Sequence, residues 1–231
     1  MAWYRTGAVT PVEFEETGTK ELWKFTEHTS YVFAVTVDEG GSVYSGGGGG
    51  DNTVRKISSS GSQVWSFIGH TDWVRAVAVD AGGNVYSGSY DKTVRKISSN
   101  GSQVWSFTGH TGEVYAVAVD ANGNVYSGSR DKTVRKINSS GQQVWSFTGH
   151  TGWVFAVAVD ASGNVYSGGG DNTVRKINSS GAQVWSFTGH ISTVYAVAVD
   201  KDGNVYSGSD KTVRKIKNNM NAYKLAYYED I

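Results

Sequence analysis

The strongest constraint on the fold is a repeat of about 40 residues that runs through most of the chain. The five histidines stand at positions 28, 70, 110, 150 and 190 of the 231 residues, and each opens one copy. Residues 70–109 differ from residues 110–149 at 8 of 40 positions, and the latter differ from residues 150–189 at 7. A period of about 40–45 residues with strand-like content is typical of propeller blades.

Each copy reads as four short strands. In residues 70–109, runs of β-branched and aromatic residues predict strands at 74–79, 84–87, 93–97 and 103–107. Clusters of Gly, Asn, Ser and Asp separate the runs, and such clusters indicate tight hairpin turns. The spacing suits a four-stranded antiparallel meander. The chain has 30 glycines and one proline, which agrees with many turns and few breaks inside strands.

The copies predict an all-β fold, a five-bladed β-propeller of four-stranded antiparallel blades. Residues 22–25 match residues 64–67 as a fourth strand, whereas the last copy loses the pattern after Ile216. We therefore expect residues 20–27 to complete the fifth blade and to close the ring, which removes its open edges. The corresponding divisions are an N-terminal extension (1–19), a single propeller domain (20–216) with blades starting near 28, 70, 110, 150 and 190, and a tail (217–231).

Two alternatives to this closure are left open. In the first, the tyrosine-rich tail (Tyr223, Tyr227, Tyr228) supplies the closing strand. In the second, five repeats do not close and chains pair between molecules. The sequence is consistent with a monomer or a small homo-oligomer.

Several residues of each copy carry a resemblance to a known family. Gly69-His70, Ser87-Gly88-Ser89, Asp91 and Thr93-Val94 resemble the WD-repeat pattern, and the His, Ser-Gly, Asp and Thr-Val positions recur in all five copies. In that family, His, Ser, Asp and Trp form a hydrogen-bonded network inside each blade. The resemblance assigns three of these roles here, to His28/Ser45/Asp51, His70/Ser87/Asp91, His110/Ser127/Asp131, His150/Ser167/Asp171 and His190/Ser207/Asp210. The Trp positions hold Ile57, Ile97, Ile137, Ile177 and Ile216, which implies a network short of one donor per blade.

A different tryptophan stands on the fourth strand of each copy, at Trp23, Trp65, Trp105, Trp145 and Trp185. The run from Gly18 to Trp23 is similar to the quinoprotein-type propeller repeat, in which such a tryptophan docks against the neighbouring blade. The match is short and includes no cofactor ligands. We therefore expect no quinone and no other cofactor.

The polar residues of the repeat have structural interpretations. A catalytic triad needs an exposed nucleophile and oxyanion donors, whereas five identical Ser/His/Asp sets indicate a structural network, so we expect no enzyme. One histidine per blade cannot converge on one metal ion. The run from Asp120 to Asn124 resembles the start of a calcium loop but lacks the distal bidentate glutamate, and a hairpin turn explains it.

Charge and hydropathy exclude several partners. The formal net charge is zero, and the Arg-Lys pair of each repeat is balanced by two aspartates, which argues against nucleic acid and anionic membranes. Lys96 and its equivalents stand where the WD pattern has an apolar residue, and we expect an acidic partner for them, the turn-column Asp80 and its equivalents. No apolar run suits a signal peptide or a transmembrane span, so we expect a cytoplasmic location, with virion association as the alternative.

The copies disagree mainly three and five residues after each histidine and just before each network aspartate. In WD-repeat propellers the equivalent positions surround the central channel on one face, where peptide partners commonly bind. Tyr, Trp and Arg dominate binding hot spots. The candidate ligand-binding rim therefore comprises Tyr31, Phe33, Trp73, Arg75, Tyr90, Glu113, Tyr115, Arg130, Trp153, Phe155 and Tyr195.

The first functional hypothesis is a non-enzymatic scaffold that binds a protein or peptide partner at this rim. The alternative is a lectin-like propeller that binds glycans at several equivalent sites, although the rim residues do not repeat as equivalent sites would. Two weaker interpretations remain. The N-terminal segment vaguely resembles the start of some phage tail-associated proteins, or the repeats were recently amplified or engineered, with turn drift and no dedicated ligand.

Overall fold

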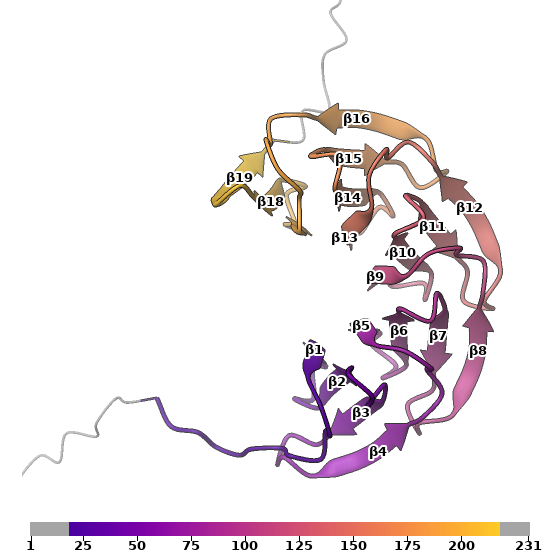
Figure 1. Ribbon diagram of the computed structural model, residues 1–231, viewed down its shortest axis with the longest axis vertical. Coiled ribbons are helices and arrows are strands. Elements are labelled where there is room, and N and C mark those ends of the chain that lie inside the picture. Colours follow the sequence, from indigo (N-terminus) through magenta and orange to yellow (C-terminus); the bar gives the residue numbers. More distant parts are fainter. Residues whose placement is uncertain (1–18, 218–231) are drawn as a thin grey trace, which may run out of the picture.

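The computed structural model describes residues 19–217, which form five antiparallel sheets and, in this range, no helix (Figure 1). Four sheets have four strands each, and the fifth has three. The strands are β1 (Val32–Val37), β2 (Val43–Gly47), β3 (Val54–Ile57), β4 (Gln63–Phe67), β5 (Val74–Val79), β6 (Val85–Ser89), β7 (Val94–Ile97), β8 (Gln103–Phe107), β9 (Val114–Val119), β10 (Val125–Ser129), β11 (Val134–Ile137), β12 (Gln143–Phe147), β13 (Val154–Val159), β14 (Val165–Gly169), β15 (Val174–Ile177), β16 (Gln183–Phe187), β17 (Ala196–Val199), β18 (Val205–Ser209) and β19 (Thr212–Ile216).

Each sheet is one propeller blade, so the expected blade architecture is confirmed. In the second blade, β5 and β8 have the predicted bounds, β7 starts one residue later, and β6 begins at Val85 and continues to Ser89. A bulge between Val74 and Ala76 interrupts the regular β5–β6 pairing at the start of β5. Bulges increase local twist and redirect side chains. The bulge adjoins the variable positions that follow each histidine.

The hydrophobic core lies between blades. One cluster joins Tyr44, Val54 and Phe67 of the first blade to Val74 of the second, and all four side chains are buried. Val77 and Val79 pack against the same cluster from β5. Equivalent clusters join the second blade to the third, the third to the fourth, and the fourth to the fifth. A blade therefore buries its apolar faces only by stacking on its neighbours, as repeat architectures generally do.

The fourth-strand tryptophans add a second contact between neighbouring blades, at the outer strands. The indole Nε1 of Trp65 donates to the carbonyl oxygen of Ser99 on the next blade, at 3.0 Å. The ring lies over Gly101, whose φ is +90°, and a Cβ there would meet Trp65 Cγ at 2.9 Å. Glycine is required for both the backbone conformation and the close approach. The quinoprotein-type docking that the sequence indicated is confirmed.

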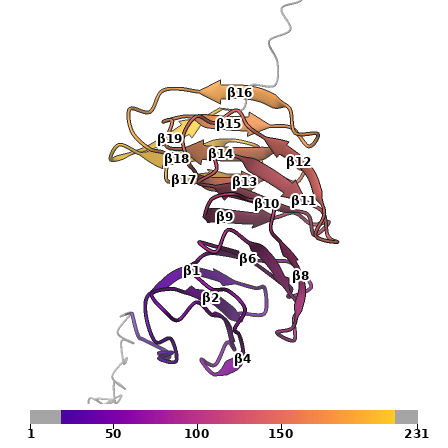
Figure 2. The same ribbon diagram turned by 45° about the vertical axis from the view of Figure 1, so that its right-hand side comes forward.

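The expected ring closure is not present in the structure. Figures 1 and 2 show an arc whose two ends, at β1 and at β17–β19, stand apart. Residues 19–31 form no strand, and the fifth sheet has the order β17-β18-β19 with no fourth strand among residues 19–217. Trp23 instead docks at the other end of the arc, where its Nε1 donates to Ser59 O at 3.1 Å. The alternative closing segment, with Tyr223, Tyr227 and Tyr228, lies outside the described residues.

Replacing Trp105 with alanine tests the role of the interblade tryptophans. We expect Trp105→Ala to lower the unfolding free energy by about 3 kcal/mol, because the substitution removes packing on the next blade and the bond to Ser139 O, which is 3.0 Å long. Urea unfolding followed by tryptophan fluorescence and circular dichroism measures this change. Val104→Ala, at an exposed neighbour, is the control and should change stability by less than about 0.5 kcal/mol. Equal effects of the two substitutions would contradict the assignment.

Candidate functional site

The Ser/His/Asp sets form a buried network inside each blade. In the third blade, Nδ1 of His110 lies 2.7 Å from Asp131 Oδ2, and Nε2 lies 2.7 Å from Ser127 Oγ. A carboxylate only accepts, so Nδ1 carries the hydrogen and Nε2 accepts from the serine hydroxyl. Ser127 and His110 are buried. Their hydrogen-bonding capacity is used within the blade, as expected for a structural network.

An arginine adds donors to the network in a blade that lacks the family's tryptophan. The hydroxyl of Thr133 donates to Asp131 Oδ1 at 2.6 Å, and Arg135 Nε donates to Thr133 Oγ1 at 3.1 Å. Arg135 Nη1 also donates to Gln143 Oε1 on the outer strand, at 2.7 Å. The network therefore extends across the blade to its outermost strand. Ile137, at the family's tryptophan position, is fully buried in the cluster between the second and third blades.

The same network holds the loops that present the rim. In the second blade, Asp91 accepts from the backbone N–H of Thr71, at 3.2 Å, on the loop that leads to Trp73. Ser89 Oγ donates to the carbonyl of Asp72, and the N–H of Tyr90 donates to the carbonyl of Trp73, both at 2.9 Å. The buried carboxylate thus fixes the relative positions of the two rim loops of a blade.

These contacts keep the network carboxyls ionised. Burial raises the pKa of Asp51, but hydrogen bonds from Thr53 and Thr29, together with the nearby His28 ring, outweigh it and lower the pKa to about 2. Burial likewise opposes a low pKa at Asp131, where the hydrogen bond from His110 nevertheless holds the pKa well below its usual range. Burial lowers the pKa of His110, although Asp131 acts in the opposite direction.

The turn aspartates lie at the end of each blade that is opposite the rim loops. Asp120 Oδ1 accepts from the backbone N–H groups of Asn122 and Asn124, both at 2.9 Å. Its Oδ2 accepts from Asn124 Nδ2 at 2.9 Å and from the Tyr126 hydroxyl at 3.0 Å. The hairpin interpretation of this run is confirmed, because both oxygens of the Asp120 carboxylate accept hydrogen bonds from its own hairpin. Residues 19–217 contain no group of three or more acidic or histidine side chains placed to hold a metal.

A tyrosine ring lies between each repeated lysine and the turn aspartate that was predicted as its acidic partner. Lys96 Nζ lies 5.4 Å from the centroid of the Tyr86 ring, and the Tyr86 hydroxyl donates to Asp80 at 2.9 Å. Among the described residues, Lys96 makes no ion pair within about 4 Å. The tyrosine stands between ammonium and carboxylate and stabilises the cation through its ring face. The turn aspartate still acts on the lysine column by its charge: burial lowers the pKa of Lys176, and Asp160 acts against this lowering. The predicted acidic partner is therefore present, and the tyrosine ring is the part that was not predicted.

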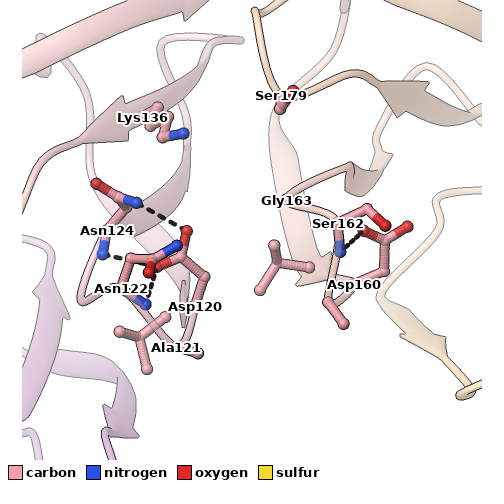
Figure 3. A pocket seen from close by; sticks show the side chains of 12 residues that line it. Asp120, Ala121, Asn122, Asn124, Lys136, Asp160, Ser162, Gly163 and Ser179 are labelled. Atoms are coloured by element: carbon pink, nitrogen blue, oxygen red, sulfur yellow. Dashed lines mark hydrogen bonds between the residues drawn. The ribbon is translucent and has the colours of Figure 1, made fainter.

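Clefts open between the turns of adjacent blades at this end (Figure 3). The cleft between the third and fourth blades has a volume of about 390 Å³, and Asp120, Asn124, Lys136, Asp160 and Ser162 lie along it. Clefts of about 430 and 450 Å³ occupy the equivalent positions between the first and second and between the fourth and fifth blades. From the sequence, these turns were interpreted only as connections. The signal that could have identified the clefts was the recurrence of an Asp and a Lys in every copy.

The predicted rim residues form a continuous series of aromatic contacts along the inner edge of the arc. Phe33 stacks on Trp73 at a centroid separation of 5.0 Å, and Trp73 stacks on Tyr90 at 5.3 Å. Tyr90 meets Tyr115 edge-on at 5.4 Å, and Tyr115 stacks on Trp153 at 6.0 Å. The remaining contacts extend the series to both ends of the arc, with Tyr31 on Phe33 and Tyr195 on Phe155.

The two rim arginines have different surroundings. Arg130 lies 4.5 Å above the Trp153 ring and forms an ion pair with Glu113 at 2.6 Å. Arg75 lies over Phe33 at 4.6 Å and near Tyr90 at 5.8 Å. No carboxylate within residues 19–217 pairs with Arg75, and its buried Nε has no hydrogen-bond partner there. Sequence reasoning placed Arg75 at the rim but could not distinguish it from Arg130.

Comparisons with known proteins agree with both resemblances. The family model "WD domain, G-beta repeat" matches residues 141–178 and 181–215, and the model "Outer membrane protein assembly factor BamB" matches residues 50–152. Among solved structures, the WD40 β-propeller domain of Doa1 is 24% identical, with a TM-score of 0.73 over 82% of this chain and 64% of that chain. The computationally designed Ika8 protein is 30% identical, with a TM-score of 0.75 over 84% of this chain and 61% of that chain. The chain thus spans less than two thirds of either structure. No curated protein sequence gives a significant match.

The lowered pKa of Asp51 predicts how acid acts on the network. Its folded pKa of about 2 lies below its ordinary value of 3.8, so its stabilising effect is complete above about pH 4 and is lost as the pH falls toward 2. We expect Asp51→Asn to lower the unfolding free energy by about 1–3 kcal/mol at pH 7, and the deficit to shrink across that window. Urea unfolding between pH 2 and pH 7 measures both. The exposed Asp202→Asn is the control. A deficit independent of pH would refute a role for the charge.

Proposed function

Because the chain is a β-propeller of the WD-repeat type, with quinoprotein-like features, we propose that it is a non-enzymatic scaffold that binds a peptide segment of a protein partner along the aromatic rim. The WD-repeat architecture supports a protein-interaction scaffold in general. The unbroken series of rim contacts from Tyr31 to Tyr195 is the observation that supports this particular surface. Because the rim residues differ from blade to blade, they make one asymmetric site rather than five equal ones.

The rim chemistry defines the partner further. Trp153 and Tyr195 are exposed, and large rigid aromatics bury much area at little entropic cost. Arg75 offers a guanidinium held between aromatic rings with no carboxylate paired to it among the described residues. A partner carboxylate would satisfy this charge. The proposed ligand is therefore an extended peptide with apolar or aromatic residues and an acidic group.

A displayed library of random twelve-residue peptides tests the rim. We expect selected peptides to bind the native chain and to bind the Trp73→Ala/Trp153→Ala double variant at least about 30-fold more weakly, because hot-spot truncations cost about 2 kcal/mol or more. The affinities are measured by calorimetry, and circular dichroism checks that the variant stays folded. Arg75→Gln should remove the preference for acidic peptides.

Val104→Ala/Val144→Ala, on exposed outer-strand positions, is the matched control and should leave binding unchanged. Selection of no specific peptide, or equal binding to the rim variant, would remove the proposal.

A second candidate function is multivalent glycan binding at the interblade clefts. Unlike the rim, these clefts repeat the same residue types. Asp120, Lys136 and Asp160 line one of them, and Asp38, Lys56 and Asp80 line another. Repeated polar clefts of about 390–450 Å³ suit small neutral ligands with hydroxyl groups, and equal sites give avidity. This is the observation that favours the lectin alternative.

Titration separates the two candidates. A glycan array followed by calorimetry should give several equal sites per chain if the clefts bind sugars, with weaker binding after Lys136→Ala. No glycan binding on the array, with a single peptide site on the rim, would leave the first proposal standing alone.

A further inference from the structure

The four interfaces between blades within residues 19–217 share one close contact, in which a valine of one blade lies over a glycine of the blade before it. A Cβ on Gly46 of β2 would meet Val74 Cγ1 of the second blade at 2.7 Å. The same contact recurs at the next three interfaces, between Gly88 and Val114, between Gly128 and Val154, and between Gly168 and Val194. Only glycine leaves room for such an approach, so each interface has a valine half and a glycine half.

The last blade presents a glycine half with nothing on it. Gly208 on β18 is the counterpart of Gly168, and among the described residues a Cβ there would meet only Ala196 Cβ, at an ordinary 3.6 Å. Its cross-strand partner Val213 is 80% exposed, whereas the counterpart Val174 is fully buried. The face formed by β18 and β19 therefore has the chemistry of an interblade core and an open place for a valine.

The first blade presents the matching valine half. Val32 on β1 is the counterpart of Val74 and is 46% exposed, whereas Val74 is fully buried against the preceding blade. Val35 and Val37, on the same strand, are 65% and 59% exposed. No blade lies on this face within residues 19–217, and Figure 1 shows it at the free end of the arc. The two free ends are therefore complementary halves of one kind of interface.

Residues 23–28 lie on the first blade as the outer strand of a preceding blade would. Trp23 Nε1 donates to Ser59 O at 3.1 Å, which is the bond that the outer strand of each of the next three blades makes to its neighbour. Phe25 meets the His28 ring edge-on with centroids 6.0 Å apart, and this contact follows each later outer strand too. The position before the first blade thus already has its outer segment. Within residues 19–217 it lacks the three inner strands.

The curvature of the arc gives the size of the gap. The five blades fill 64% and 61% of the two solved structures on which they superpose. A ring of this curvature has about eight blades, the upper end of the usual range, so about three are absent from the described arc. A second copy of the chain brings five blades and does not fit. The sheet β17-β18-β19 lacks an outer strand among residues 19–217, so each border of the gap falls between the third and the fourth strand of a blade.

We propose that a partner polypeptide of about three blades of the same WD type fills this gap. Its first strand lies beside β19, its first complete blade places a valine on Gly208, and its last three strands pack on Val32 and pair with residues 23–25. The chain already forms this kind of interface four times, and closing the ring covers both apolar ends at once. The contact uses the blade faces rather than the aromatic rim, so it is independent of the proposed peptide binding.

A fragment of the chain itself supplies the probe. Residues 60–177 comprise an outer strand (β4), two complete blades and three inner strands (β13, β14 and β15), which is the composition that the gap requires. We expect one such fragment to bind one full 231-residue chain, with a single site in calorimetry and a one-to-one complex in light scattering. The full chain alone should give its own mass of 24.8 kDa.

Substitutions at the two ends of the full chain show where the fragment binds. Gly208→Leu should weaken binding at least about 10-fold, because leucine fills the space that the incoming valine needs. The chain should stay folded, as checked by circular dichroism, since a Cβ at this position meets only Ala196. Val32→Asp at the other end should weaken binding similarly, because it places a charge in an apolar interface. Val104→Asp, at an exposed position of the outer strand β8, is the matched control and should leave binding unchanged.

Joining the fragment to the C-terminal end of the full chain through a flexible linker of about 20 residues covers the case of a fragment that does not fold alone. In the joined chain, Gly208→Leu should lower the midpoint of thermal unfolding by about 3 °C or more, whereas in the native chain it should not lower it. Equal effects in the two proteins would overturn the proposal. So would a folded fragment that does not bind, binding that the end substitutions leave unchanged, more than one fragment per chain, or self-association of the full chain alone.

Discussion

The packing of one blade on the next is the interaction on which the rest of the structure depends. A sheet of four short strands has two apolar faces and cannot cover either one itself. The contact is tight: a Cβ on Gly88 would meet Val114 Cγ1 of the next blade at 2.7 Å. Because every interface needs the same residues, the strands repeat almost without change. At each end of the arc, one half of such an interface is left uncovered within the described residues.

The polar residues divide the molecule into a constant end and a variable end. At the constant end, turn aspartates, tyrosines and lysines recur in each blade, and the clefts between blades recur with them. At the variable end, the buried network ties the loop before Trp73 to the turn that carries Tyr90. The network leaves these two side chains outside its hydrogen bonds. A constant scaffold thus presents residues that are free to differ, which is a suitable basis for a single asymmetric binding surface.

Sequence reasoning predicted the blades well because their period, turns and apolar alternation are local. The strand bounds around Val74–Val79 and Gln103–Phe107 and the docking of Trp65 on the next blade followed from pattern alone. Closure of the ring did not, because it depends on the rotation between blades, which no single residue encodes. The tyrosine ring between each repeated lysine and its turn aspartate was not predicted, for a similar reason. Lys96 meets a tyrosine ring because Tyr86 lies between it and Asp80 in the pleated sheet.

The rim residues named from the sequence lie together in one series of contacts, but their individual interactions could not be predicted. Arg130 is paired with Glu113, whereas Arg75 has no such partner among the described residues. This difference depends on a contact between a loop residue and a turn residue 17 positions later. That distinction required the three-dimensional structure.

Hydrogen exchange at β19 tests the central claim, that a blade is protected by stacking between two neighbours. We predict that amides of Val174–Ile177, in the complete fourth blade, exchange slowly, and that those of Thr212–Ile216, whose sheet has no outer strand among the described residues, exchange much faster. Equal exchange rates of the two strands would contradict the account.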